Sequence, residues 1–384
     1  MKKFFYIGLA GLALFEILKV YFIMPMPGSQ EMDSIDIAYF LHKYRWSFRI
    51  VLGLMIIAGS IQAFRIKWWW IPIIPLIAVG YIVYNFNFEM TADHMFIEPE
   101  TLTFKSKPEN LLGDSSVIIG VAYKGEAKAY PIRYILYHHQ VRDTIGAKPI
   151  MVTYCNVCRT GRVFEPTVNG QPENFRLVGM DHFNAMFEDV STKTWWRQVN
   201  GEAIAGPLKG SALPEFESMQ VTIGKFFSLY PFGKVMDAEV SSKTYYDSLG
   251  KFERGKSKGK LTRTDSLSWK EKSWVVGVEQ GKVSKAYDWL ELKDKRIIND
   301  MIGSVPIVLL LSDDTTSFSV FQRPSEADLF SIRNDTLFTG KASYDFSGRN
   351  LTPESQPLTL KRIPAYQEFW HSWRTFHPDT ETYK

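Results

Sequence analysis

Three long apolar runs precede residue 90, and mixed polar and apolar sequence follows them. The runs extend from Phe4 to Met24, from Phe48 to Phe64 and from Trp68 to Phe88. Each is close to the ~20 residues that a helix needs to cross ~30 Å of hydrocarbon. The pattern predicts a membrane domain of three transmembrane helices over residues 1–90, with the lipid bilayer as its partner.

The first run also has the basic start of a signal peptide, Lys2 and Lys3. It lacks a small-x-small cleavage site and two more apolar runs follow, so we expect it to be retained. The basic residues Arg65 and Lys67 then lie on the same side as the N-terminus, which predicts a cytoplasmic N-terminus. Three spans would place everything after Glu89 outside the cytoplasm. The expected location is the inner (cytoplasmic) membrane of a bacterium, multi-pass, with an extracytoplasmic C-terminal body.

One pair of charges interrupts the first apolar run. Glu16 and Lys19 are three residues apart, so they share a face of a helix and can form an ion pair there. We interpret them as a structural pair facing a neighbouring helix. The alternative is a functional polar site within the membrane.

Beyond residue 90 the sequence repeats itself. Residues 117–152 and 274–309 align without a gap at a constant offset of 157 (274 − 117). The matched positions include Gly120 with Gly277, Tyr130 with Tyr287, Asp143 with Asp300, Gly146 with Gly303, and Pro149 with Pro306. We interpret the body as two related copies, over residues 95–240 and 241–384.

Both copies have the alternation and turn residues of strands more often than the periodicity of helices. The expected strands are a hairpin at 117–123 and 128–132 around Lys124 to Glu126, a strand at 149–154, and strands at 162–168 and 175–180 joined through Asn169-Gly170. The expected helices are Ile132 to Val141, Ile223 to Tyr230 and Ala365 to Phe376. The fold class predicted is a β-rich α+β body with antiparallel sheet.

The candidate functional residues include a C-x-x-C motif. Cys155 and Cys158 follow an apolar strand, and a second strand rather than a helix follows them. This context argues against a thioredoxin motif, whose nucleophile sits at a helix N-terminus. It is typical of a metal knuckle, in which two thiolates converge on one ion. The chain has only 2 Cys, so further ligands have to be His or carboxylate.

The two copies differ at the candidate ligands. At the constant offset Ser312 replaces Cys155, Thr315 replaces Cys158 and Lys295 replaces His138; with a small gap, Ser343 replaces His182. The framework of Gly, Pro and Asp persists in the second, degenerate copy. We therefore expect one metal site in the first copy, for copper or zinc, with the ligands Cys155, Cys158, His138 and His182.

Other functions stay open. The same C-x-x-C would serve a thiol–disulfide oxidoreductase, or it could be a structural clip in a non-catalytic ligand-binding or interaction module. Whether the protein is an enzyme, and on what substrate, is undecided. A net charge of +4 over 384 residues is no nucleic-acid footprint, and 45% hydrophobic residues exclude a disordered chain.

The motifs together resemble a known family. The segments VGVAYKGEAKAYPI, YHHQVRDTIG, KPIMVTYCNVC and WWRQVNGEAIAGPL are similar to the domain-of-unknown-function family 3179 (DUF3179), closely over residues 95–240 and loosely beyond. The resemblance implies a β region framed by Gly and Pro and aligns His138, Asp143 and both cysteines with its motifs. It brings no activity. This chain departs from the family pattern at Asn156, where Pro is usual, at Arg159, where Gly is common, and at His139, where Glu is common.

Overall fold

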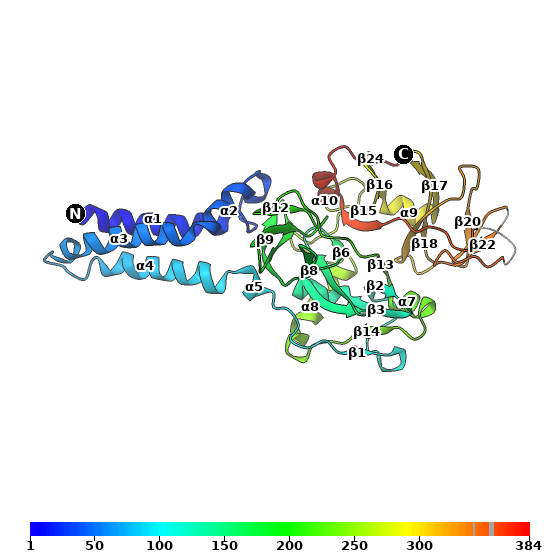
Figure 1. The fold of residues 1–384 in the computed structure, drawn as a ribbon, viewed down its shortest axis with the longest axis horizontal. Helices are drawn as coiled ribbons and strands as arrows, with labels where there is room; N and C mark the ends of the chain where they lie inside the picture. Colours follow the sequence, from blue (N-terminus) through cyan, green and yellow to red (C-terminus); the bar gives the residue numbers. More distant parts are fainter. Residues whose placement is uncertain (341, 353–356) are drawn as a thin grey trace. The chain divides into compact units, whose positions relative to one another are not determined.

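The computed structural model describes residues 1–340, 342–352 and 357–384, and the chain divides into two compact units. Unit 1 combines Met1–Ile97 with Glu173–Ala212, and unit 2 combines Glu98–Pro172 with Leu213–Lys384. The ribbon is strand-rich beyond the first helices, which is the expected α+β class (Figure 1). The segment Glu173–Ala212 leaves the unit that holds the cysteines, although it lies inside the first expected copy.

Unit 1 starts with a helical region. Its elements are α1 (Lys2–Tyr21), η1 (Ser29–Glu31), α2 (Ile35–Lys43), α3 (Arg45–Phe64), α4 (Ile73–Tyr84), the π-helical η2 (Asn85–Glu89) and α5 (Ala92–Met95). Helices α1 and α3, of 20 residues each, are long and apolar enough to cross a membrane.

The expectation of three such helices is corrected to two candidates, because α4 has 12 residues and reaches only Glu89 through η2. It starts late because residues 67–72 form turns and Pro72, which has no amide proton, precedes the first helical residue.

The helices of unit 1 are apolar outside and charged inside. Ile57 on α3 and Ile77 on α4 are 67% and 66% exposed, whereas Glu16 on α1 is fully buried. The Glu16 carboxylate accepts hydrogen bonds from Lys19 Nζ at 2.8 Å and from Arg49 Nε at 2.7 Å. The Glu16–Lys19 pair expected from their spacing is present, as part of a network that links α1 to α3.

A four-stranded antiparallel sheet completes unit 1. Its strands, in the order β12-β11-β10-β9, are β9 (Phe175–Asp181), β10 (Asn184–Asp189), β11 (Trp195–Arg197) and β12 (Ala203–Ala205). The Met180 amide donates to the Ile23 carbonyl at 2.7 Å, just beyond α1. A Cβ on Gly179 would lie 2.3 Å from that same carbonyl oxygen, so only glycine fits this approach.

Unit 2 is built from small sheets. Its strands up to residue 236 are β1 (Phe104–Lys105), β2 (Val117–Tyr123), β3 (Glu126–Pro131), β4 (Gln140–Ile145), β5 (Lys148–Cys155), β6 (Thr160–Phe164), β7 (Thr167–Val168), β8 (Gln171–Pro172), β13 (Met219–Thr222) and β14 (Lys234–Met236). The later strands are β15 (Trp274–Gln280), β16 (Val283–Asp288), β17 (Ile297–Ile302), β18 (Val305–Leu311), β19 (Phe318–Gln322), β20 (Ser331–Arg333), β21 (Thr336–Phe338), β22 (Ser343–Tyr344), β23 (Ala365–Phe369) and β24 (Glu381–Thr382). Its helices are η3 (Lys107–Glu109), α6 (Ile132–His138), α7 (Ile223–Leu229), η4 (Val240–Ser242), α8 (Lys243–Glu253), α9 (Trp289–Lys295) and α10 (Trp370–Phe376).

Four sheets of unit 2 contain its longer strands. The orders are β1-β14-β3-β2-β13 and β4-β5-β6 for the earlier strands, and β23-β15-β16-β24 and β17-β18-β19 for the later ones. The expected hairpin is β2–β3, with Gly120 opposite Ala129. The turn at Asn169-Gly170, where both residues have positive φ, joins only the short β7 and β8. The expected strand at 175–180 is β9, which pairs with β10 and not through that turn.

Two expected helices are shorter than their patterns suggest. Helix α6 ends at His138, and Gln140–Ile145 is strand β4, paired with β5. The first five residues of the expected helix from Ala365 to Phe376 are strand β23, because they pair with β15. In both places the hydrogen bonds of a neighbouring strand override a local helical pattern. Helix α7 agrees with expectation to within one residue.

Candidate thiol site

Strand β5 carries the C-x-x-C motif into the interior of unit 2. It is the central strand between β4 and β6, and every residue from Ile150 to Cys155 is buried. Cys155 pairs with Thr160 across the turn that contains Cys158. The cysteines are not joined in a disulfide, and neither side chain is exposed to solvent. The expected strand-to-strand turn is therefore present, and its thiols face the interior.

The two thiols interact with each other. Burial, and next a hydrogen bond to Cys155, raise the pKa of Cys158 well above the usual value for a thiol. The hydroxyl of Ser372 and the positive charge of Lys272 act in the opposite direction. At neutral pH the resting state of Cys158 is thus the protonated thiol, and a thiolate there needs compensation from a cation.

Lys272 supplies a cation beside the motif. Its ammonium group is buried and donates to the carbonyl of Val157, between the two cysteines, at 2.7 Å. Burial lowers the pKa of Lys272 to about 8, and the nearby Cys158 and Cys155 oppose this shift. The amine therefore still carries its proton at pH 7, although deprotonation comes far earlier than for an exposed lysine.

His371 is the second buried polar side chain next to the Val157 carbonyl. Its Nε2 atom lies 2.9 Å from Lys272 Nζ and 3.1 Å from the Val157 carbonyl oxygen. Burial and the adjacent charge of Lys272 lower the pKa of His371 to about 3, so this imidazole is neutral. A protonated Lys272 has to donate to Nε2, which assigns the imidazole proton to Nδ1.

Strand β23 and helix α10, which carries His371, also contact the C-x-x-C turn. The Phe369 amide donates to the Cys158 carbonyl at 2.9 Å. Next to it, the fully buried Glu368 accepts hydrogen bonds from Thr160 at 2.9 Å, from Arg162 at 3.0 Å and from Ser372 at 2.9 Å. The C-x-x-C turn is thus held by a segment more than two hundred positions later in the chain.

Arg159, one of the departures from the family pattern, ends the turn. Its φ of 58° lies in the left-handed region, where glycine is favoured, and this accounts for the Gly that is common there. The guanidinium is buried, lies over the Trp274 ring at 3.5 Å, and donates to the carbonyls of Phe252 at 3.3 Å and Glu253 at 3.2 Å. Arginine at this position therefore has a strained backbone conformation, and its guanidinium provides hydrogen bonds to the last carbonyl groups of α8.

The two candidate histidines make other contacts. His138 ends α6, and its Nε2 lies 2.5 Å from the Tyr246 hydroxyl on α8. His182 belongs to unit 1, where its Nδ1 is 2.7 Å from Asp181 and its Nε2 is 3.4 Å from Asp33. The hydrogen bond to Asp181 raises the pKa of His182.

Across residues 1–340, 342–352 and 357–384, no group of three or more His, Cys, Asp or Glu is placed to hold a metal ion. The set of four ligands stays a prediction.

The residues that surround the thiols were not found from the sequence. Lys272, His371 and Ser372 belong to the expected second copy, which was read as degenerate because it lacks the cysteines. No spacing links them to the motif. The only available signal was that histidine and lysine in this copy had no assigned role.

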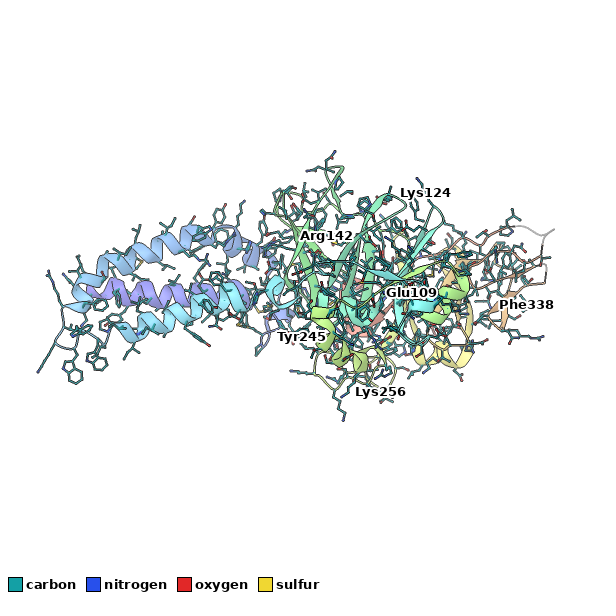
Figure 2. All side chains as sticks on the ribbon, turned by 90° about the horizontal axis from the view of Figure 1, so that it is seen from below. Glu109, Lys124, Arg142, Tyr245, Lys256 and Phe338 are labelled. Carbon is teal, nitrogen blue, oxygen red and sulfur yellow. The ribbon has the colours of Figure 1, made fainter. Side chains whose placement is uncertain are left out.

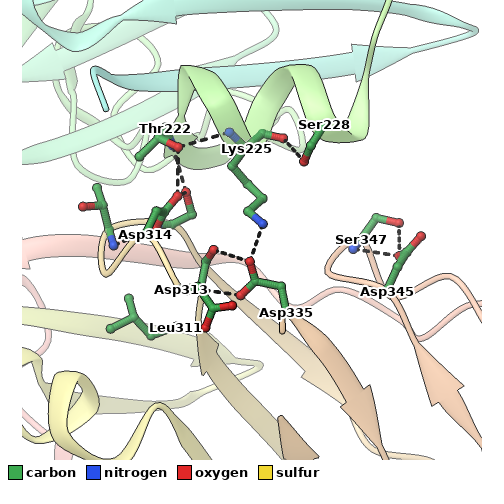
Figure 3. A network of polar contacts seen from close by, with 12 residues as sticks. Thr222, Lys225, Ser228, Leu311, Asp313, Asp314, Asp335, Asp345 and Ser347 are labelled. Carbon is green, nitrogen blue, oxygen red and sulfur yellow. Dashed lines mark hydrogen bonds and ion pairs between the residues drawn. The ribbon is translucent and has the colours of Figure 1, made fainter. Parts of the chain in front are cut away.

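The turn after β18, later in unit 2, carries a different set of side chains. There Asp314 accepts from the Thr222 hydroxyl at 2.8 Å, and Asp335 accepts from Lys225 at 2.5 Å (Figure 3). Ser312 also donates to Asp335, at 2.9 Å. Two carboxylates and Lys225, which forms an ion pair with Asp335, thus contact the turn after β18, whereas thiols and Lys272 lie at the turn after β5.

Comparison with known proteins gives a family and nothing more specific. No curated protein and no solved structure matches the chain. One family model, described as a protein of unknown function (DUF3179), matches residues 97–380, which contain the C-x-x-C turn, Lys272 and His371. The chain therefore belongs to the DUF3179 family, as its motifs suggested.

Proposed function

We propose that the protein holds one soft metal ion, Cu(I), between Cys155 and Cys158 at the extracytoplasmic face of a membrane. The observation that carries the proposal is the buried ammonium of Lys272, 2.7 Å from the carbonyl between the two cysteines. A Cu(I) ion held by two thiolates has one net negative charge. The single positive charge of Lys272 offsets it in a site where an uncompensated charge would be costly.

Copper suits this donor set better than zinc. Thiolates select soft ions such as Cu(I), and Cu(I) accepts two ligands, whereas structural zinc takes four. His138 and His182 are engaged with Tyr246 and with Asp181. The proposal accordingly keeps the two cysteines of the expected site and assigns no bond to either histidine.

The test is copper loading of the full chain under anaerobic conditions. We expect about one Cu(I) per chain, lost in Cys155→Ser and in Cys158→Ser. His138→Ala and His182→Ala are the matched controls and should load normally. Loss of copper in either histidine variant would instead favour the set of four ligands. Absence of copper from the reduced wild-type chain would end the proposal.

Redox chemistry is the second candidate, because the two thiols contact each other. Oxidation would form one disulfide and release two protons and two electrons to an acceptor. The raised pKa of Cys158 counts against a fast thiolate nucleophile. A thiol count before and after mild oxidation, with the reduction potential, separates a redox couple from a metal site.

The membrane anchor is part of the same proposal. A bundle that exposes Ile57 and Ile77 and buries Glu16 is suited to lipid rather than water. We propose that Ile73–Glu89 makes a third crossing, although its ~25 Å is a few ångströms short of ~30 Å. Protease access to the Gly255–Lys260 loop in spheroplasts checks the orientation: cleavage is expected there and protection in inverted vesicles.

The two-copy organisation of residues 95–240 and 241–384 also belongs here. Its support is the shared order of elements: β2 and β15 start 157 residues apart (274 − 117), as do α6 and α9 (289 − 132). Tyr130 donates to Asp143 at 2.6 Å and Tyr287 to Asp300 at 2.9 Å, at matched positions. In this organisation the turn after β5, in the first copy, lies next to α10 of the second copy, and the turn after β18, in the second copy, lies next to α7 of the first. This arrangement would explain why Lys272 and His371, from the second copy, lie beside the thiols of the first copy.

A further inference from the structure

A cavity of about 550 Å³ lies against the C-x-x-C turn, on the side of Asn156. The C-terminal half of α8 and the segment that follows it, up to Thr262, form its remaining walls. Its volume is within the range of small-molecule sites. The cavity belongs entirely to unit 2.

The lining carries four cations and no acid. The basic residues are Lys251, Arg254, Lys256 and Lys258, and Lys256 marks this segment in Figure 2. Within the part of the chain that the structure describes, none of the four forms an ion pair. Glu253 is next to them in sequence, but its carboxylate is buried and accepts from Arg133 at 2.7 Å. Four positive charges therefore surround one hollow without a neutralising partner.

Hydroxyl and amide groups add hydrogen-bonding capacity. Ser257 and Thr262 face each other at 2.6 Å between their oxygens, and Asn156 presents a half-buried amide. Like charges around one cavity repel each other, and a multiply charged anion removes that cost while it gains charge-assisted hydrogen bonds. A cationic ligand would be repelled by the same four charges.

We propose that this cavity binds a small, multiply charged anion, of the phosphate or polycarboxylate class. The site is independent of copper, because no cysteine lines it. Asn156 joins the two sites, since it lies between Cys155 and Cys158 and is also part of the cavity wall. An anion seated there would cover one side of the C-x-x-C turn.

The experiment is calorimetric titration of the full chain, in a neutral detergent and at constant ionic strength, with pyrophosphate and with citrate. We expect saturable binding of one probe in preference to the other, which identifies the class. The double variant Lys256→Gln/Lys258→Gln should raise its Kd at least about tenfold, because each lost charged hydrogen bond is a large contribution. Lys260→Gln is the matched control: the residue is exposed in the same segment but does not line the cavity, so its Kd should stay within about twofold.

Two results would overturn the proposal. One is no saturable binding of either probe to the wild-type chain. The other is equal weakening in the double variant and in Lys260→Gln, which would mean diffuse attraction to a basic loop. Cys155→Ser should bind the anion as the wild type does, so failure of the copper site and failure of the anion site are distinguishable.

Discussion

The ammonium nitrogen of Lys272 lies 2.7 Å from the carbonyl oxygen of Val157, inside the turn that carries both cysteines. This contact holds a positive charge beside two buried thiols, and the group that accepts the hydrogen bond is a neutral carbonyl, not a carboxylate. The same nitrogen is 2.9 Å from His371 Nε2, and that imidazole is neutral. The positive charge of Lys272 is therefore available to stabilise thiolates at Cys155 and Cys158, and the first prediction follows from this.

Lys272→Met should weaken Cu(I) binding by about tenfold or more, because an opposite charge within a few ångströms of a buried anion commonly stabilises it by at least ~1.4 kcal/mol. The variant keeps the length of the side chain and loses its charge. Competition with a coloured Cu(I) chelator measures the effect. Lys282→Met, at an exposed position, is the control and should bind normally. Equal affinities for wild type and Lys272→Met would show that the charge has no part in metal binding.

Copper affinity should rise with pH. Burial and the bond to Cys155 keep Cys158 protonated at neutral pH, so metal binding has to displace the proton of this thiol. The logarithm of the apparent affinity is expected to increase by about one per pH unit for this proton. Chelator competition between pH 6 and pH 8 gives the slope, and a flat profile would contradict a protonated Cys158 as a ligand.

Local sequence was sufficient for elements whose hydrogen bonds are local. The hairpin β2–β3 follows from alternating apolar residues and a turn at Lys124 and Gly125, which take positive φ values of 49° and 82°. The position of Cys155 at the end of a buried strand followed in the same way. Strand β23 was missed because its identity depends on pairing with β15, far away in the sequence.

The thiol site was predicted only in its cysteines. Lys272 and His371 reach Val157 from 115 and 214 positions away, and no periodicity encodes such a contact. His138 was a reasonable candidate by type, but a partner such as the Tyr246 hydroxyl cannot be read from spacing. In the helical region, the apolar run from Trp68 to Phe88 predicted a longer helix than α4, which begins only after Pro72 and has 12 residues.

Arg159→Gly should destabilise unit 2, even though glycine is common there in the family and suits a φ of 58°. Relief of the left-handed backbone gains about 1 kcal/mol. Loss of the buried hydrogen bonds to Gln367, Phe252 and Glu253 costs roughly 1.5–3 kcal/mol each by itself. We expect a net loss of about 3 kcal/mol or more in the free energy of unfolding. Chemical denaturation checks it, and an unchanged or increased stability would mean that the guanidinium contacts contribute little.

Acid should destabilise the protein below pH 6.5, and part of the effect should disappear in His139→Asn. His139 is buried, and burial lowers its pKa to about 4, whereas an unfolded chain has a His pKa near 6.5. The unfolded state therefore binds the proton first as pH falls. The stability contributed by the neutral imidazole is complete above pH ~6.5 and is lost progressively towards pH 4, at up to about 1.4 kcal/mol per pH unit.

The variant isolates this contribution. Asparagine tolerates the φ of 61° at this position and does not titrate. Unfolding free energies of wild type and His139→Asn at intervals from pH 7.5 to pH 4.5 should converge as the pH falls, because only the wild type carries this proton uptake. His371→Asn should show the same convergence, since its pKa of about 3 has the same cause in burial. Parallel pH profiles for wild type and both variants would mean that these imidazoles take up protons equally in the folded and unfolded chain.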